Sequence, residues 1–193
     1  TTLPRSIFLS SIEEGLKEAQ GAVLSLKKIN NVPMAMLSEM MIGFGKSLQG
    51  ETLAKASLNY ENFTEAKYWN TFQKSAPVFL AVYKRYKLQL LCLFNFHEQA
   101  FSLVRERTSW IEAFGGVDFS FRSDYYLYAG ITCAALYCSV PEPEKQEMYL
   151  EILNECIVEH KLLSEHGEIK INFYAPYLIL KAEKAKIENN PME

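Results

Sequence analysis

The segment GFGKS, at residues 43–47, ends like a loop that binds the phosphates of a nucleotide. Such a loop has the form G-x-x-x-x-G-K-[ST], in which backbone N–H groups surround the phosphates and the lysine reaches the terminal ones. The first glycine would have to stand where Met40 is, and the preceding residues MAMLSEMM have helical spacing, whereas the loop requires a strand. We therefore predict an amphipathic helix in which Gly43 and Gly45 permit close packing. We expect no ATP binding that depends on Lys46, and no bound cofactor.

The three histidines do not form a metal-binding pattern. HEQAF, at residues 97–101, begins like the zinc motif H-E-x-x-H, but its fifth residue is Phe101, so the second ligand is missing. His160 and His166 are six residues apart and would not share one face of a helix. We predict no metal site and interpret His97, His160 and His166 as polar surface or turn residues.

No motif of a catalytic site stands out either. The chain contains no nucleophile elbow of the form G-x-S-x-G and no pair of carboxylates that differs from ordinary charged helix faces. Catalytic triads can assemble from residues that are far apart in the sequence, so an unrecognised small enzyme remains an alternative. The expectation is that the chain is not an enzyme and has no catalytic residues.

The four cysteines indicate a reducing compartment. Cys92, Cys133, Cys138 and Cys156 stand in apolar runs, and none belongs to a C-x-x-C pair. A free thiol in such a run behaves as a small hydrophobic group. We predict reduced core residues and a cytoplasmic location.

Charge and hydropathy argue against two classes of partner. The net charge is −3, and nucleic-acid binding relies on basic surfaces, so we expect no nucleic-acid partner. The most apolar stretch, residues 125–140, is shorter than the roughly 20 apolar residues of a spanning helix, and no signal peptide opens the chain. We expect no membrane partner. The chain begins Thr-Thr-Leu, which indicates a domain of a larger protein or a processed chain.

One basic and aromatic segment is a candidate for binding a partner. In YKRYK, at residues 83–87, the tyrosines belong to an apolar stripe, while Lys84 and Arg85 lie away from it. Arg105 and Arg107 follow on the next predicted helix. One interpretation is an ordinary solvated helix face. The other is a patch for an acidic peptide or a partner domain, formed by Lys84, Arg85, Arg105 and Arg107.

The elements that must position these residues are helices. Apolar residues recur with the helical period, and breaks fall at NNVP (30–33), Gly50, Asn95 and Gly115-Gly116. Thr64 is a predicted N-cap, and residues 51–63 a long connection. The only weak strand candidate is GEIKINFY, at 167–174. The expected helices cover about 4–28, 34–49, 65–74, 77–94, 97–114, 122–139, 143–166 and 172–188, with 122–139 central and buried. We predict an all-α fold of stacked antiparallel helical hairpins.

Two stretches resemble known helical regions. YKLQLLCLFNFHEQAFSLV, at 86–104, resembles a degenerate tetratricopeptide repeat, with its turn at Asn95-Phe96-His97 and a small residue at Ala100. DYYLYAGITCAALY (124–137) followed by EKQEMYLEIL (144–153) resembles the helical region of very large signalling kinases. In that family a serine/threonine kinase-like domain and an AAA-type ATPase precede a tetratricopeptide-like array, and GAF and histidine kinase domains often follow.

The resemblance extends over residues 58–189 and carries no catalytic residue onto this chain. It includes LNYENFTEAKYW (58–69) and FYAPYLILKAEKAKIE (173–188). It implies one tetratricopeptide-like superhelical domain over 1–193, with 1–57 outside the matching part. It also implies a non-catalytic interaction and signal-relay module of a larger kinase and ATPase, whose partner is a protein, a peptide or a neighbouring domain. The alternative is a helical repeat domain that senses a peptide or a small ligand.

Overall fold

The described part of the chain is helical. The structure is a computed structural model, and it describes residues 11–74, 76–106, 119–165 and 170–188. Over these ranges it contains no β-strand, and the one β-type pairing is an isolated bridge between Tyr60 and Phe63. None of the described helices is long and apolar enough to cross a lipid bilayer. The predicted all-α class is confirmed.

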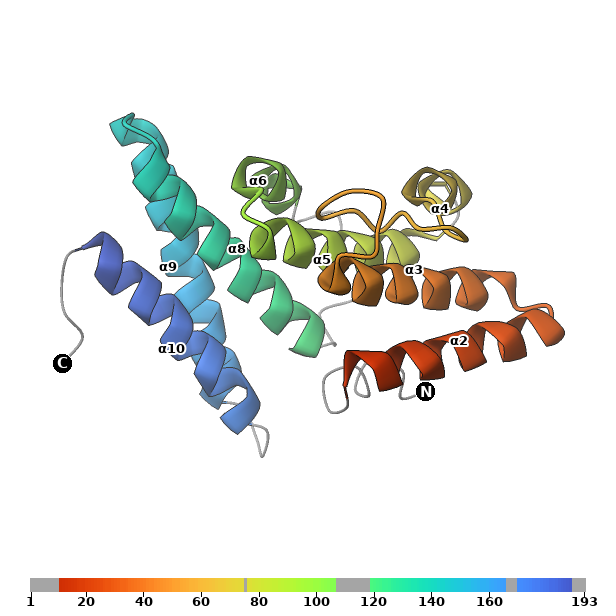
Figure 1. The fold of residues 1–193 in the computed structure, drawn as a ribbon. Helices are drawn as coiled ribbons and strands as arrows, with labels where there is room; N and C mark the ends of the chain where they lie inside the picture. Colours follow the sequence, from red (N-terminus) through yellow and green to blue (C-terminus); the bar gives the residue numbers. More distant parts are fainter. Residues whose placement is uncertain (1–10, 75, 107–118, 166–169, 189–193) are drawn as a thin grey trace. The chain divides into compact units, whose positions relative to one another are not determined.

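The helices fall into two compact units. Contacts divide the chain into Thr1–Leu90 and Leu91–Glu193, and the border between these units lies inside a helix. The sequence had suggested one domain over residues 1–193. In chain order the helices are α2 (Ile12–Lys28), α3 (Val32–Gln49), α4 (Glu65–Phe72), α5 (Pro77–Leu93), α6 (His97–Arg105), α8 (Phe119–Ser139), α9 (Pro143–Glu165) and α10 (Lys170–Ile187) (Figure 1).

Several helix ends follow local signals that are visible in the sequence. Thr64 is the N-cap of α4, and its side-chain oxygen accepts a hydrogen bond from the Lys67 N–H at 3.4 Å. Gly50 ends α3 in the left-handed conformation, with φ 76°. Asn95, between α5 and α6, is also left-handed, with φ 64°. These three predictions are confirmed, because each signal acts within a few residues of the helix end.

The first two helices begin with side-chain caps. The Ser11 hydroxyl accepts from the Glu14 N–H, and the Glu14 carboxylate accepts from the Ser11 N–H, which makes a capping box for α2. The part of the first predicted helix before Ser11 lies outside the described residues. Asn31 caps α3 by accepting from the Met34 N–H at 3.3 Å. Because proline needs no N–H partner in the first turn, Pro33 lies inside α3.

The last helix contains a proline. Pro176 lies within α10, beyond its first turn, although it removes one backbone hydrogen bond from the helix. Lys170 to Tyr174 are helical, so the strand candidate at 167–174 is wrong for its described part.

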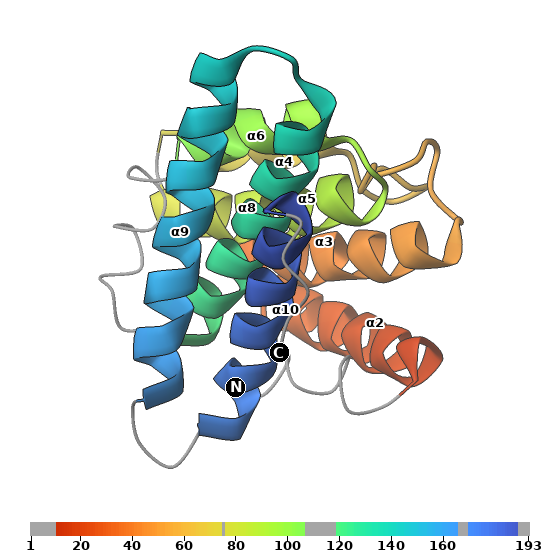
Figure 2. The same ribbon diagram turned by 90° about the vertical axis from the view of Figure 1, so that its left-hand side faces the viewer.

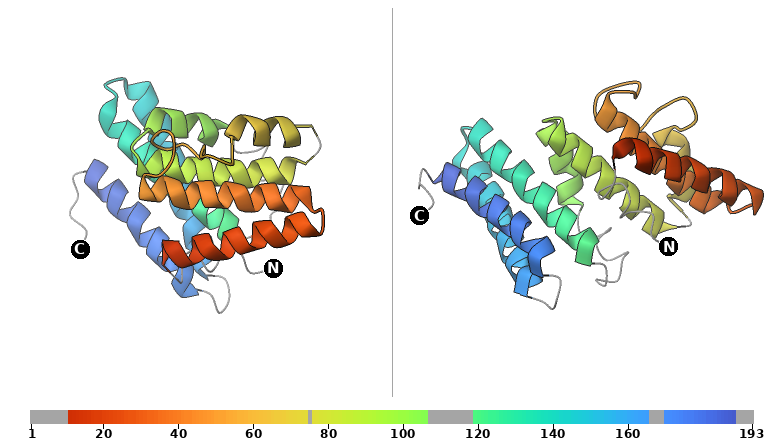
Figure 3. Two further views of the ribbon diagram at one scale, coloured as in Figure 1. Left: turned by 45° about the vertical axis from the view of Figure 1, so that its right-hand side comes forward. Right: turned by 60° about the horizontal axis from the view of Figure 1, so that its bottom comes forward.

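In the first unit, α2 and α3 form an antiparallel pair (Figure 3), and aromatic side chains of α4 contact α5. The rings of Phe72 and Phe79 stack with their centroids 4.6 Å apart. The Tyr68 hydroxyl donates a hydrogen bond to the Phe79 carbonyl oxygen at 3.1 Å. Phe44 joins α3 to α5, since its ring centroid lies 4.8 Å from that of Tyr86. These contacts make α3 the central helix of this unit.

Two glycines of α3 allow neighbouring segments to approach closely. A Cβ atom added at Gly43 would overlap the carbonyl oxygen of Leu58. One added at Gly45 would lie 2.8 Å from a methyl group of Leu16 on α2. The predicted packing role of these glycines in an amphipathic helix is confirmed, and Gly45, Lys46 and Ser47 lie within α3 and form no loop.

In the second unit, α8 contacts α6, α9 and α10, and Figure 2 shows α8, α9 and α10 side by side. Ala129 and Cys133 of α8 are completely buried. At Gly130 a Cβ atom would lie 2.5 Å from a Leu180 methyl group and 3.3 Å from the Cys156 Cβ, so this glycine lets α8 approach both later helices. The prediction that α8 is the buried central helix is confirmed for this unit.

The sulfur-containing residues are mostly core residues. Cys92, Cys133 and Cys156 are buried free thiols, as predicted, but Cys138 is exposed, so the prediction is wrong for this residue. Cys138 is the penultimate residue of α8, where the helix leaves the core. Three methionines of α3 fill the core of the first unit, namely Met36, Met40 and Met41.

Candidate functional site

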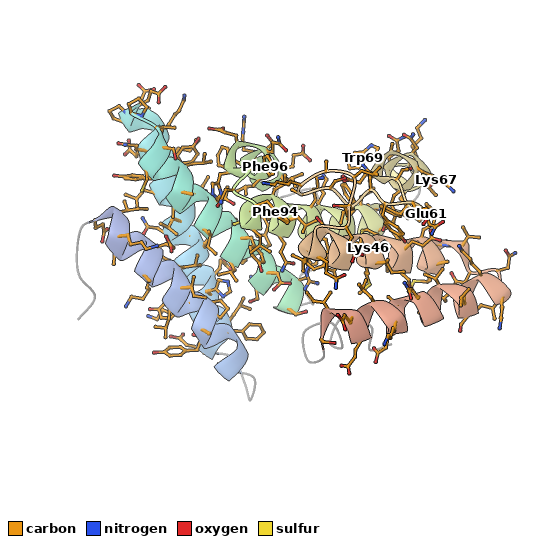
Figure 4. All side chains as sticks on the ribbon, in the orientation of Figure 1. Lys46, Glu61, Lys67, Trp69, Phe94 and Phe96 are labelled. Atoms are coloured by element: carbon orange, nitrogen blue, oxygen red, sulfur yellow. The ribbon has the colours of Figure 1, made fainter. Side chains whose placement is uncertain are left out.

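An open cleft lies in the first unit between α2, α3 and the connection that follows α3. Its volume is about 680 Å³. Figure 4 labels Lys46 on α3 and Glu61 on the connection, which contribute two of its charged side chains. The lining comprises Gln20, Val23, Leu24 and Lys27 of α2, Glu39, Ile42 and Lys46 of α3, and Glu51, Tyr60, Glu61 and Asn62 of the connection.

Both lysines of the cleft are held in ion pairs. The Lys27 ammonium lies 2.7 Å from the Glu39 carboxylate, which joins α2 to α3. The Lys46 ammonium lies 2.9 Å from the Glu51 carboxylate and 6.0 Å from the centre of the Tyr60 ring. Lys46 therefore has an ion-pair partner and an aromatic neighbour within its own unit.

Tyr60 places a protonated hydroxyl at the cleft. Burial, together with the negative charge of Glu39, raises the pKa of Tyr60 well above its ordinary value. The ring stacks on Phe63, with centroids 6.2 Å apart, and the backbones of the two residues exchange hydrogen bonds at 3.0 and 3.1 Å. The phenol therefore stays neutral at physiological pH and is held in place by a tight turn.

The connection is anchored by a partly buried carboxylate. Glu65, the first residue of α4, accepts hydrogen bonds from the Leu58 N–H at 2.7 Å and from the Ser57 hydroxyl at 3.2 Å. Its own N–H donates to the Asn59 side chain at 2.7 Å. Each of these bonds fixes a residue that stands just before the cleft residues Tyr60, Glu61 and Asn62.

Two residues of α5 complete this anchor. The Tyr83 hydroxyl donates to the Glu65 carboxylate at 2.5 Å. The Lys87 ammonium lies 3.0 Å from the same carboxylate and donates to the Ala56 carbonyl oxygen at 2.8 Å. These bonds hold the connection against α4 and α5, so one wall of the cleft is preformed in the absence of a ligand.

Several cleft side chains have hydrogen-bonding capacity to spare. Glu61 and Asn62 are exposed on the connection, and Gln20 is exposed on α2. Among the described residues, none is bonded to these three side chains or to the Tyr60 hydroxyl. Leu24 is 65 % exposed and adds an apolar edge. The cleft can therefore hold a ligand by hydrogen bonds, by one carboxylate and by an apolar contact.

The residues predicted to bind a partner do not line this cleft. Lys84 is only 8 % exposed, because its side chain lies against Trp69, with the ammonium 5.8 Å from the ring centre. This burial contradicts the solvated helix face expected for Lys84. The Arg85 guanidinium lies 5.6 Å from the Tyr86 ring centre, which leaves it half-buried. Arg105 is exposed on α6 in the second unit, and Arg107 lies outside the described residues.

The histidines differ from the prediction in one case. His160 is completely buried in the second unit, where its Nε2 lies 2.9 Å from the Ser123 carbonyl oxygen and its Nδ1 has no hydrogen-bond partner in the described structure. The expectation of a surface residue is therefore wrong for His160, while His97 is half-buried and His166 lies outside the described residues. Across the described ranges, no group of three or more potential metal ligands comes together.

His160 makes a testable contribution to pH dependence. Burial lowers its pKa to about 4, although the bond to Ser123 opposes that shift. The unfolded chain takes up a proton near pH 6.5 and the folded chain only near 4, so stability falls as pH drops through this window. In His160→Gln, the glutamine side chain can still donate a hydrogen bond to the Ser123 carbonyl oxygen, but it does not titrate. Between pH 7 and 5.5, the free energy of unfolding of wild type, measured in urea, should fall by about 1 kcal/mol more than that of His160→Gln. Parallel losses in both proteins would contradict this assignment.

The sequence contained a partial signal for the cleft. LNYENFTEAKYW, at 58–69, belongs to the stretch that resembles the helical region of signalling kinases, and it contains Tyr60 and Glu61. Their meeting with α2 and α3 depends on tertiary packing, which helical periodicity does not reveal.

Comparison with known proteins adds no relative. No family model, no curated protein sequence and no solved structure matches this chain.

Proposed function

We propose that this chain is a non-catalytic protein-interaction module whose first unit binds a peptide segment of a partner in the cleft between α2, α3 and the connection. The observation that carries the proposal is the cleft itself, with a volume of about 680 Å³. This volume lies within the usual range of roughly 300–1,000 Å³ for binding sites. Because one wall is already held in place through Glu65, binding causes a smaller loss of conformational entropy.

The lining favours a peptide over a small molecule. Leu24 is 65 % exposed and the Glu51 side chain 54 %, so both remain open to solvent at the edge of the cleft. Small ligands are usually held in sites that bury most of their surface. An extended peptide can cross an open cleft and use the free hydrogen-bonding groups of Gln20, Tyr60 and Asn62.

The proposal assigns no reaction to the cleft. Four of its five charged side chains neutralise one another in the Lys27–Glu39 and Lys46–Glu51 pairs. The pKa of the Tyr60 hydroxyl lies far above the value near neutral pH that a general base requires. The lining is suited to recognition.

A wider role follows from the resemblance in residues 58–189. We propose that the helices form a tetratricopeptide-like superhelix within a larger signalling kinase, where binding of a partner biases the arrangement of the attached catalytic domains. Hairpins of such arrays contact mainly their neighbours, so small changes in tilt can be passed along them. This wider role rests on the sequence resemblance alone.

The test is a selection of random twelve-residue peptides displayed on phage against the whole chain. We expect enriched peptides to bind in calorimetry and to shift the NMR signals of amides in α2, α3 and residues 50–64. Asn62→Trp should block binding by filling the cleft from an exposed position, whereas Glu18→Trp places the same side chain on α2 away from the lining. The proposal fails if no peptide is enriched, or if the enriched peptides act elsewhere and tolerate Asn62→Trp.

A further inference from the structure

The charges that line the cleft do not balance. The lining contains three glutamates and two lysines. Each lysine is matched by one carboxylate, Lys27 by Glu39 and Lys46 by Glu51. Glu61 remains, and none of the described cations pairs with it. A cationic group can therefore pair with Glu61 without breaking an existing ion pair.

The surroundings of Glu61 determine how a cation would be recognised. Lys46 lies over the Tyr60 ring and Phe63 stacks on it, so other groups of this unit already occupy the ring of Tyr60. The hydroxyl of Tyr60 is unshared and neutral, and its oxygen can accept a hydrogen bond. A guanidinium or ammonium group would thus bind through oxygen atoms of Glu61 and Tyr60, by charge-assisted hydrogen bonds.

The apolar part of the lining lies on the two helices. Leu24 and Val23 belong to α2 and Ile42 to α3, and Leu24 is the exposed member of the three. The carboxylate of Glu61 belongs to the connection, at the other wall. A segment that crosses the cleft therefore meets an aliphatic side chain on one wall and the negative charge on the other.

From this arrangement we propose that the cleft selects partner segments in which a lysine or an arginine stands next to an aliphatic residue. The inference rests on the proposed peptide-binding function and specifies the class of peptide. The basic side chain pairs with Glu61, and the aliphatic neighbour packs on Leu24. Arginine binds more tightly than lysine, because its planar group can donate two parallel hydrogen bonds to one carboxylate. An acidic residue in the same place would face Glu61 unpaired.

The test uses two labelled peptides that differ at one residue. Fluorescein-GSGLRISGS carries the basic residue between aliphatic neighbours, and fluorescein-GSGLEISGS replaces it with an acidic one. Fluorescence anisotropy with the whole chain should show the arginine peptide binding at least about tenfold more tightly, a difference of roughly 1.4 kcal/mol. The preference should shrink as sodium chloride is raised from about 50 to 500 mM, since screening weakens exposed charge pairs.

Variants at two exposed glutamates separate a local from a general charge effect. Glu61→Lys should abolish or reverse the preference for the arginine peptide, and Glu61→Gln should reduce it. Glu18→Gln removes the same charge from an exposed position of α2 outside the cleft and should leave the preference unchanged. Circular dichroism confirms that each variant is folded, which is expected because both side chains lie on the surface.

The outcomes distinguish this inference from the function on which it rests. If neither peptide binds, and the phage selection also yields none for the cleft, the proposed function fails and this inference fails with it. If peptides bind the cleft with no preference for a basic residue, or if Glu18→Gln changes the preference as much as Glu61→Gln, only this inference is overturned.

Discussion

Replacing Gly43 with alanine is expected to destabilise the first unit by about 2 to 3 kcal/mol. The new Cβ atom would overlap the carbonyl oxygen of Leu58, and this atom belongs to the backbone, so no rotamer change can relieve the contact. Leu58 is also held in place, because its N–H donates to Glu65 at 2.7 Å. Alanine would otherwise favour a helix by up to about 1 kcal/mol, which the overlap outweighs.

The chain contains matched controls for this substitution. Gly21 lies within α2, and a Cβ atom added there would meet nothing within 4 Å, so Gly21→Ala should stabilise the protein by about 0.5 to 1 kcal/mol. Gly45→Ala should fall between the two, since the atom it meets is the end of the flexible Leu16 side chain. Urea unfolding of the three variants gives the ranking directly. Equal stability of Gly43→Ala and Gly21→Ala would contradict the close approach of α3 and the connection.

The parts of the fold that the sequence predicted correctly depend on short-range chemistry. Thr64 caps α4 with its own hydroxyl, and Gly50 and Asn95 take left-handed conformations that few other residues tolerate. Such signals are complete within a few residues. They explain why α5 was predicted over 77–94 and is found over Pro77–Leu93.

The errors concern polar side chains whose surroundings come from distant residues. His160 was assigned to the surface by its residue type, but its imidazole meets the Ser123 carbonyl of another helix. Lys84 was placed outside the apolar stripe, yet the residue is buried and its ammonium lies over the ring of Trp69. In both cases the partner stands on a different helix, so the periodicity of one helix carries no information about it.

The cleft could not be predicted from the sequence, for a related reason. The connection that supplies Tyr60 and Glu61 has no helical or strand period, so its residue types do not determine its path. That path is fixed by bonds to Glu65 and by the bond from Lys87 to Ala56, which are 31 residues apart. A site made by such a segment becomes visible only when the tertiary contacts are known.

The second large effect is expected at Glu65, the residue that holds this connection. Glu65→Ala removes the acceptor of the Tyr83 hydroxyl, the Leu58 N–H and the Lys87 ammonium together. Breaking a buried ion pair costs about 3 to 5 kcal/mol. The Glu65 and Lys87 side chains retain 16 % and 20 % of their exposure. We therefore expect a loss near the lower end, about 3 kcal/mol, in urea unfolding at pH 7. Glu18→Ala, at an exposed position of α2, should change stability by less than about 0.5 kcal/mol.

The pH dependence of this loss distinguishes a charged anchor from mere packing. Burial alone would raise the pKa of Glu65, but the bonds from Tyr83 and Leu58 and the Lys87 charge outweigh it, and the pKa is lowered. A carboxyl whose pKa is lower in the folded state stabilises the protein above its unfolded pKa, and this contribution is lost as pH falls through the folded pKa. The advantage of wild type over Glu65→Gln should therefore shrink below about pH 4.5. A constant difference from pH 7 down to pH 3 would show that Glu65 acts through its shape, and the connection would then need another anchor.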